Sequence, residues 1–297
     1  MSLQQLDNLL GMMAQNPHPF PINDGPLAIR PWVEIAAGHL PSAEGVSVKN
    51  VNCGPCDGGL YLPEGGDASR LIIFYHGGCF VFGSSKTHHV IASNLAKAAN
   101  CAVLVPNYRL APEHMAPAAH DDAFKVYKWA LADGYRPGKI ALSGDSAGGN
   151  LAVVVALRAQ AAGLPAPAAL GLMSPWVDFV GEGASHREVK DDPIITAQLI
   201  EMALDAYIGP DDLRSPLFTP LYADLSGLPK VLVHVGGRER LRDDAVSLVD
   251  RIKRFGGDAE LKIFDGMIHT FQMYAPIVDE GMTSIHETAA FLTSTMA

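Results

Sequence analysis

The 297-residue chain has few cysteines, an excess of acidic over basic side chains, and no long apolar run. Four cysteines are too few for the disulfide framework that holds small secreted scaffolds together. The formal net charge of −10 argues against a nucleic-acid partner or an anionic membrane surface. No apolar stretch reaches the roughly 18 residues of a membrane-spanning helix. We therefore expect no integral membrane segment.

Targeting signals and repeats are also missing. The N-terminal residues lack the basic and apolar regions of a secretory signal, so we expect a cytoplasmic protein. No internal repeat or low-complexity tract interrupts the chain. With 48% hydrophobic and 18% charged residues, the composition is that of a globular protein with a large core.

Strand-like and helix-like segments alternate along most of the chain, which predicts a mostly parallel sheet with helices on both faces. An N-terminal helix over residues 2–14 should dock on the body through an apolar stripe, and a second helical segment follows around 27–38. The stripe consists of Leu3, Leu6, Leu9, Leu10 and Met13. Strands are expected near 46–51, 60–62, 70–75, 101–105, 139–143, 168–174, 230–235 and 259–264. Further helices are expected near 87–99, 118–132, 147–162 and 241–255, and near the C-terminus. An amphipathic segment, 194–207, lies between the last two of these internal helices.

The motif Gly144-x-Ser146-x-Gly148 lies between a predicted strand and a strongly apolar helical stretch. This is the strand–turn–helix context of a nucleophile elbow. A serine in such a strained turn needs residues with almost no side chain two positions before it and two positions after it. Gly144 and Gly148 meet that requirement. The following helix directs its free N–H groups at negative charge that develops there. Ser146 is therefore the candidate nucleophile.

Two segments could supply the partners of Ser146. Strand 70–75 runs into His76-Gly77-Gly78, where adjacent glycines allow backbone N–H groups to approach a substrate oxygen. The alternative is a glycine-rich strand end with no catalytic role. His269 follows strand 259–264, from which it can reach over the sheet edge and accept the serine proton. The alternative for His269 is an imidazole that fills a loop or the core.

Five segments recur in the same order in the bacterial hormone-sensitive-lipase-like esterases of the α/β-hydrolase fold, which this sequence resembles from about residue 45 to its end. They are His76–Gly78, Tyr108–His114, Gly144–Asn150, Ser174–Trp176 and Gly266–His269. The resemblance implies an α/β-hydrolase fold with a mostly parallel eight-stranded sheet, helices on both faces and a helical cap. It also implies a serine carboxylesterase without metal or organic cofactor, a small ester as substrate, and a possible homodimer through a sheet edge. The oxyanion donors that it implies are the backbone N–H groups of Gly77, Gly78 and Ala147. Asp145 and Asp178 are expected to be scaffold residues.

The sequence departs from the family pattern at two positions. Cys79 replaces a third glycine, and we expect it to change packing more than catalysis. The stretch Leu241-Arg242-Asp243 sets a register in which Glu239 occupies the position of the family's catalytic aspartate. The chain order Ser146, acid, His269 then fits the fold, and a glutamate can orient an imidazole as an aspartate does. Asp243 or Asp244 is the alternative acid.

The resemblance predicts how the chain divides between cap and core. Residues 1–45 and 177–228 are expected to form the cap, and residues 46–176 and 229–297 the hydrolase core. A cap makes the pocket concave and selects the substrate. Trp176, just after a strand end, is either a wall of that pocket or part of the core.

Three rival functions remain beside the esterase. Cys53-Gly54-Pro55-Cys56 has the sequence of a thioredoxin-type redox motif, but its strand-like flanks predict the tip of a β-hairpin instead of a helix N-terminus. We therefore expect no redox function. A non-catalytic small-ligand receptor would not need the retained Ser146 and His269. An amidase, lactonase or deacetylase would use the same triad.

Overall fold

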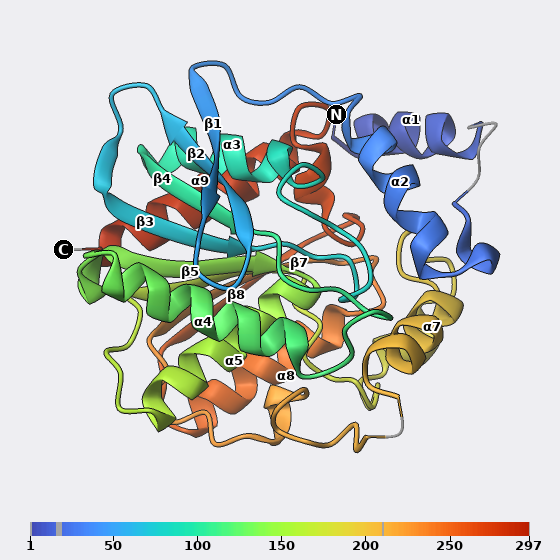
Figure 1. Cartoon of the computed structure of the whole chain (residues 1–297). Helices are drawn as coiled ribbons and strands as arrows, with labels where there is room; N and C mark the ends of the chain where they lie inside the picture. Colours follow the sequence, from blue (N-terminus) through green and yellow to red (C-terminus); the bar gives the residue numbers. More distant parts are fainter. Residues whose placement is uncertain (1, 16–19, 210, 297) are drawn as a thin grey trace.

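A single eight-stranded sheet lies between two layers of helices in the computed structural model, which describes residues 2–15, 20–209 and 211–296 (Figure 1). The strand order is β1-β2-β4-β3-β5-β6-β7-β8, and β2 alone runs antiparallel to the others. The strands are β1 (Val46–Asn52), β2 (Asp57–Pro63), β3 (Asp67–Tyr75), β4 (Cys101–Pro106), β5 (Ile140–Asp145), β6 (Ala169–Met173), β7 (Lys230–Gly236) and β8 (Ala259–Phe264). The predicted α/β-hydrolase fold is confirmed.

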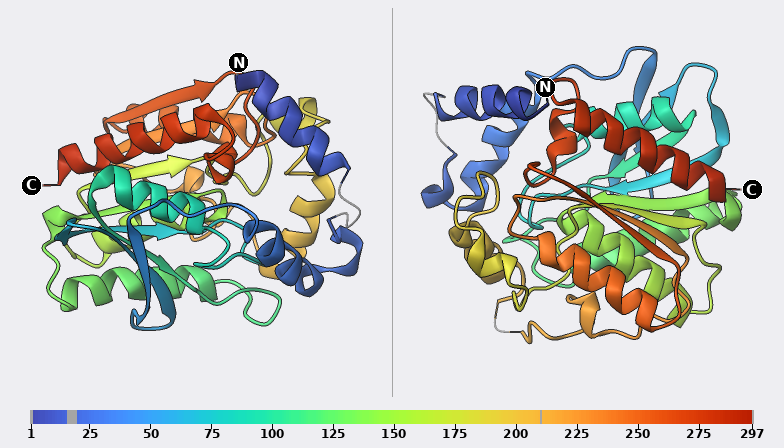
Figure 2. Two further views of the ribbon diagram at one scale, coloured as in Figure 1. Left: turned by 90° about the horizontal axis from the view of Figure 1, so that it is seen from above. Right: turned by 180° about the vertical axis from the view of Figure 1, so that it is seen from behind.

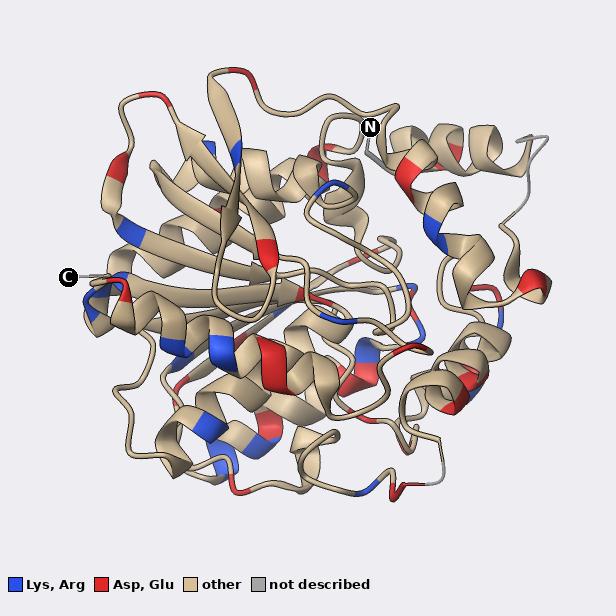
Figure 3. Ribbon diagram, in the orientation of Figure 1, with Lys and Arg blue, Asp and Glu red and all other residues tan. Residues whose placement is uncertain are grey.

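Both faces of the sheet are buried, which explains why its central strands are continuous apolar runs. In β3, Leu71, Ile73 and Tyr75 enter one core and Ile72 and Phe74 enter the other. The first core is covered by α4 (Ala118–Ala132), α5 (Ala147–Ala161) and α8 (Arg242–Arg254). The second is covered by α3 (His89–Ala99) and α9 (Asp279–Thr295) (Figure 2). Figure 3 shows Lys and Arg interspersed with Asp and Glu on the outer helices and loops, while the central strands carry almost no charge.

Three helices gather beyond the carboxyl ends of the parallel strands, where ligands of open α/β sheets bind (Figures 1 and 2). They are α1 (Ser2–Ala14), α2 (Pro26–Ala37) and α7 (Ala197–Tyr207), and α2 contacts α7. Arg30 fastens α2 to the body: its guanidinium donates to Val81 O (2.8 Å) and Ala111 O (2.7 Å) and forms an ion pair with Glu113. The assignment of residues 1–45 and 177–228 to a cap stays a prediction.

The apolar stripe of α1 docks on the loop that follows β8, as predicted. Leu6 and Leu9 are buried against Met267, Ile268 and Phe271, and Leu10 and Met13 pack partly buried against the same cluster. At the start of the stripe, Leu3 remains 53% exposed.

The largest differences from the predicted elements occur between β6 and β7. A short helix, α6 (Ser185–Glu188), has no counterpart in the prediction, and α7 begins at Ala197 instead of residue 194. The delay has a local cause, because Asp192 Oδ1 accepts from the N–H groups of Ile194 and Ile195 (both 2.9 Å) and holds them in a turn. Thr196 then caps the helix by accepting from Leu199 N–H (3.1 Å). Single 3-10 turns cover Ile22–Asp24, Pro137–Lys139, Pro220–Tyr222 and Phe271–Tyr274.

In the described ranges, no helix is both long enough and apolar enough to cross a bilayer. The edge strands are β1 and β8. The homodimer through a sheet edge stays a prediction.

Candidate active site

Ser146 lies between the end of β5 and the start of α5, in the strand–turn–helix arrangement that its motif predicts. Its backbone is strained, with φ 51° and ψ −120°. A Cβ atom on Gly144 would lie 2.4 Å from Gly148 O, and one on Gly148 would lie 1.8 Å from Tyr75 O. Only glycine therefore fits two residues before and two residues after this serine.

His269 and Glu239, thirty residues apart in sequence, are in contact. The distance from His269 Nδ1 to Glu239 Oε2 is 2.5 Å, and both side chains are buried. The other carboxylate oxygen of Glu239 accepts from Ser174 Oγ (2.8 Å) and Gly236 N–H (2.5 Å). One oxygen thus fixes the carboxylate, and the second holds Nδ1 of the imidazole so that Nε2 is the ring nitrogen available for proton transfer.

The two alternative acids point elsewhere. Asp243 accepts from a backbone N–H of α6 (2.9 Å). Asp244 accepts from the N–H groups of the chain just after Trp176 and lies 2.6 Å from His186 Nε2. Of the three carboxylates that the sequence left open, only that of Glu239 contacts His269.

Glu239 changes the acid–base behaviour of His269. Burial alone lowers the pKa of a histidine, because it penalises the charged imidazolium. The charge of Glu239 and its hydrogen bond outweigh that penalty and raise the pKa of His269 above its ordinary value. The pair therefore favours an imidazole that readily accepts a proton.

We call His76 to Phe80 the oxyanion loop, because the sequence predicts the backbone N–H groups of Gly77 and Gly78 as oxyanion donors. The Gly77 N–H donates to Asp145 Oδ1 (2.9 Å) and also to His88 Nε2 (3.2 Å), and it is therefore engaged inside the protein. The two loops are so close that a Cβ on Gly77 would lie 2.2 Å from Asp145 Oδ2. By contrast, no group in the described part of the chain accepts from the N–H of Gly78 or Ala147. Two of the three predicted donors are thus free of protein partners.

Asp145 is a fully buried carboxylate beside these donors. Burial raises the pKa of such a group, but attraction to His88 and the hydrogen bond from Gly77 outweigh this and lower the pKa of Asp145. The distance from Asp145 Oδ1 to His88 Nε2 is 3.4 Å. Asp145 therefore joins the nucleophile elbow to the oxyanion loop as a carboxylate.

Cys79 and Phe80 both have positive φ values, 56° and 62°, which side-chain-bearing residues rarely adopt. Both side chains are buried. Phe80 stacks on Tyr207 of α7, with ring centroids 4.3 Å apart. It also lies near Trp176, which is 2% exposed and packs on Phe179 at 4.6 Å. This surrounding favours the core-packing interpretation of Trp176.

A buried network of hydrogen bonds, which the sequence did not reveal, connects α7 to α5. His120 Nδ1 lies 2.7 Å from Tyr207 Oη, and its Nε2 lies 3.0 Å from Asn150 Oδ1. The amide of Asn150 donates to Trp176 O (2.9 Å) and Phe218 O (2.7 Å). Burial lowers the pKa of His120 to about 4, so this histidine is neutral near pH 7. In the sequence, the one sign of this network was that Asn150 ends the segment Gly144–Asn150.

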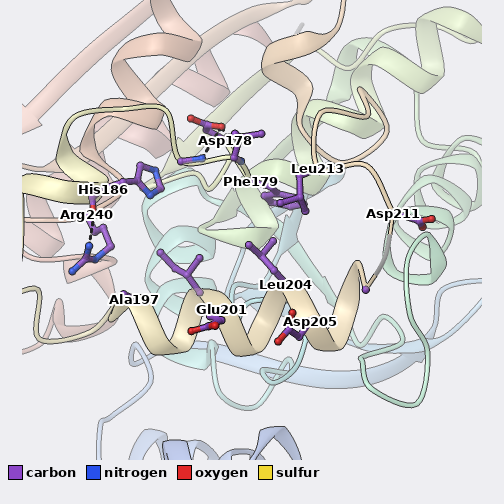
Figure 4. A pocket seen from close by; sticks show the side chains of 14 residues that line it. Asp178, Phe179, His186, Ala197, Glu201, Leu204, Asp205, Asp211, Leu213 and Arg240 are labelled. Carbon is purple, nitrogen blue, oxygen red and sulfur yellow. Dashed lines mark hydrogen bonds between the residues drawn. The ribbon is translucent and has the colours of Figure 1, made fainter.

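A cavity of about 530 Å³ opens between α7 and the chain that follows β6 (Figure 4). Neither Ser146 nor His269 lines it. Its wall combines apolar and charged side chains, among them Phe179, Ile200, Leu204, Leu213, His186, Glu201, Asp205 and Arg240. Among the residues that the structure describes, no three His, Cys, Asp or Glu side chains are grouped to hold a metal ion.

Comparison with known proteins agrees with this geometry. Residues 72–273 match the family described as the α/β-hydrolase fold. The chain is 38% identical to an acetyl-hydrolase of Streptomyces hygroscopicus over 82% of this chain and 81% of that protein. It is 32% identical to an esterase of Acinetobacter venetianus over 93% and 91%. A crystal structure of an esterase from the bacterial hormone-sensitive lipase family superposes with a TM-score of 0.92 at 37% identity, covering 99% of both chains.

Proposed function

The chain belongs to the α/β-hydrolase fold family, among the esterases of the bacterial hormone-sensitive lipase group, and on that premise we propose that it hydrolyses short-chain carboxylic esters with a Ser146–His269–Glu239 triad. The observation that carries the proposal is the 2.5 Å contact between Glu239 and His269. It joins two residues chosen from the sequence for separate reasons. The strained backbone of Ser146 supports the third member.

The proposed reaction follows the order of a serine hydrolase. Nε2 of His269 accepts the proton of Ser146 while Oγ attacks the ester carbonyl. Glu239 keeps the proton of His269 on Nδ1 and stabilises the imidazolium that forms. Collapse of the tetrahedral intermediate expels the alcohol, which takes the proton from His269. Water, activated by the same imidazole, then hydrolyses the acyl-enzyme. Neither a metal nor an organic cofactor enters these steps.

For the oxyanion we propose the N–H groups of Gly78 and Ala147 as donors. Ala147 is the first residue of α5, so the positive end of the helix adds to the stabilisation. The sequence had included Gly77, but its N–H is engaged by Asp145. Gly77 thus acts on catalysis indirectly, by fixing the loop that presents Gly78.

We expect Asp145→Ala to lower kcat by about 10²-fold with little change in KM, because a misplaced oxyanion donor stabilises only the transition state. The buried Gly77 N–H would lose its nearer acceptor and keep only His88 Nε2, at 3.2 Å, so the loop would shift. Steady-state kinetics on p-nitrophenyl butyrate give both constants. Asp145→Asn, which keeps an acceptor oxygen, should recover much of the loss. Equal losses in the two variants would contradict a hydrogen-bonding role.

The acyl-chain preference is tested with p-nitrophenyl acetate, butyrate and decanoate. We expect kcat/KM to fall by at least about tenfold from butyrate to decanoate, since each methylene group that does not fit costs transition-state binding. The bulky rings of Phe80, Trp176 and Phe179, which pack together beside the oxyanion loop, support this proposal. The acetyl-hydrolase among the relatives supports it too. Equal or faster turnover of decanoate would refute the short-chain preference, and no turnover of any ester would favour the receptor alternative.

A further inference from the structure

The Cys53–Cys56 segment forms the tip of the hairpin between β1 and β2, as the sequence predicts. Asn52 pairs with Asp57, and Cys53 N–H donates to Cys56 O (2.9 Å). The two residues between the cysteines are Gly54 and Pro55, and Gly54 has φ 99°. A glycine with positive φ at the first central position is typical of a tight two-residue hairpin turn. The two cysteines therefore face each other across the turn.

The two thiols are in contact. Cys53 Sγ lies 3.8 Å from Cys56 Sγ and 3.3 Å from Cys56 O. Residues that oppose each other in a hydrogen-bonded antiparallel pair have Cα atoms about 5.5 Å apart. Disulfides span Cα distances of about 4.4–6.8 Å. Bond formation between these sulfurs thus requires side-chain rotation, without a change in the backbone of the hairpin.

The surroundings give the two sulfurs different properties. Cys53 is fully buried, whereas Cys56 is partly exposed and can meet a reagent from solvent. The hydrogen bond between them lowers the pKa of Cys53 and raises that of Cys56. The pair can therefore lose one proton while the second is shared. From the sequence we expected no redox function, because no helix N-terminus is present to lower the pKa of a thiol. In the structure, the hydrogen bond between the two cysteines lowers the pKa of Cys53 instead.

The remaining cysteines lack these properties. Cys79 and Cys101 are buried, and burial raises the pKa of Cys79 to about 12 and that of Cys101 to about 11. Neither is hydrogen-bonded to another thiol within the described residues. They serve as internal controls for thiol chemistry at the hairpin.

We propose that Cys53 and Cys56 form a reversible dithiol–disulfide site that is oxidised by small disulfides such as oxidised glutathione. The pair loses one proton, and when the shared second proton moves to Cys53, the partly exposed Cys56 attacks one glutathione sulfur as a thiolate. This attack forms a mixed disulfide and releases one glutathione thiolate. The thiolate of Cys53 then attacks Cys56 Sγ, forming the Cys53–Cys56 bond and releasing the second glutathione thiolate. The two leaving thiolates take up the two protons. The protein loses two electrons, and the glutathione disulfide gains them.

The test equilibrates the full-length, reduced protein over a series of reduced-to-oxidised glutathione ratios. The reaction is quenched with acid, free thiols are alkylated with N-ethylmaleimide, and intact mass is measured. We expect two of the four thiols to disappear together in a single two-electron transition, giving a disulfide lighter by about 2 Da before alkylation. Peptide mapping should locate the bond between Cys53 and Cys56. Stability is a poor readout, because the disulfide closes a loop that the turn already closes.

Matched variants separate this site from other thiol reactions. Cys56→Ser should abolish the two-electron transition, and Cys101→Ser should leave it unchanged. If Cys56→Ser does not fold, the peptide map of the wild-type protein and the Cys101→Ser variant still decide the matter. Four alkylated thiols at every glutathione ratio, or oxidation that stops at a glutathione adduct, would overturn the proposal. None of these readouts depends on ester hydrolysis.

Discussion

Replacing Ser146 with alanine should lower kcat for p-nitrophenyl butyrate by about 10⁶-fold, because the reaction loses its nucleophile. The residual rate would come from the oxyanion donors and from binding. Alanine meets the same backbone strain as serine at this φ, and the backbone bond from residue 146 to Met173 O does not involve the side chain. The fold should therefore survive, which circular dichroism and thermal melting can verify.

Ser143 supplies the matched control for Ser146. It lies three residues earlier on β5, is buried, and donates its hydroxyl to Gly171 O (2.6 Å). Ser143→Ala should cost about 1 kcal/mol of stability and keep kcat close to the wild-type value. The assignment of the nucleophile fails if Ser146→Ala retains activity comparable to that of Ser143→Ala.

Replacing Glu239 with glutamine should lower kcat by about 10⁴-fold. Glutamine has nearly the same volume, so its packing against Ser174 and Gly236 can persist. It has no charge to stabilise the imidazolium of His269, and its amide N–H₂ can favour the wrong tautomer. Single-turnover and steady-state measurements of ester hydrolysis give the size of the loss.

The pH profile adds a readout that a merely structural role of Glu239 would not move. His269 acts as a base only when it is neutral, so activity falls as pH decreases through its pKa. Glu239 raises that pKa, and its neutral replacement should therefore shift the acidic limb of kcat/KM to lower pH. Asp243→Asn is the matched control and should behave like the wild type. An inactive Asp243→Asn beside an active Glu239→Gln would reverse the assignment.

The sheet could be predicted almost completely because its strands are short apolar runs bounded by turn residues. Burial on both faces of β3 or β5 leaves a signal that needs no tertiary knowledge. The segment between β6 and β7 was harder. The residue at which α7 begins depends on where the Asp192 carboxylate points. A helix of four residues such as α6 has almost no periodicity to detect.

At the candidate site, the sequence indicated the residues whose chemical type the reaction requires. It did not indicate in which direction a backbone N–H or a side chain points. Ser146, His269 and Glu239 could be chosen from motif and register, and the structure brings the last two into contact. The fate of the Gly77 N–H could not be predicted, since it depends on how closely two loops 68 residues apart approach each other. The link from His120 to Tyr207 depends in the same way on the packing of α4 against α7.

The docking of α1 has a consequence for how the protein is made. Leu6 and Leu9 form one wall of the cluster that supports Met267 and Ile268, next to His269. On the ribosome, α1 emerges long before the loop that it supports, and contacts between such distant segments form late in folding. A nascent chain can thus build most of its sheet while the loop that carries His269 still lacks its support. On the proposed mechanism, ester hydrolysis then begins only when the two distant segments meet.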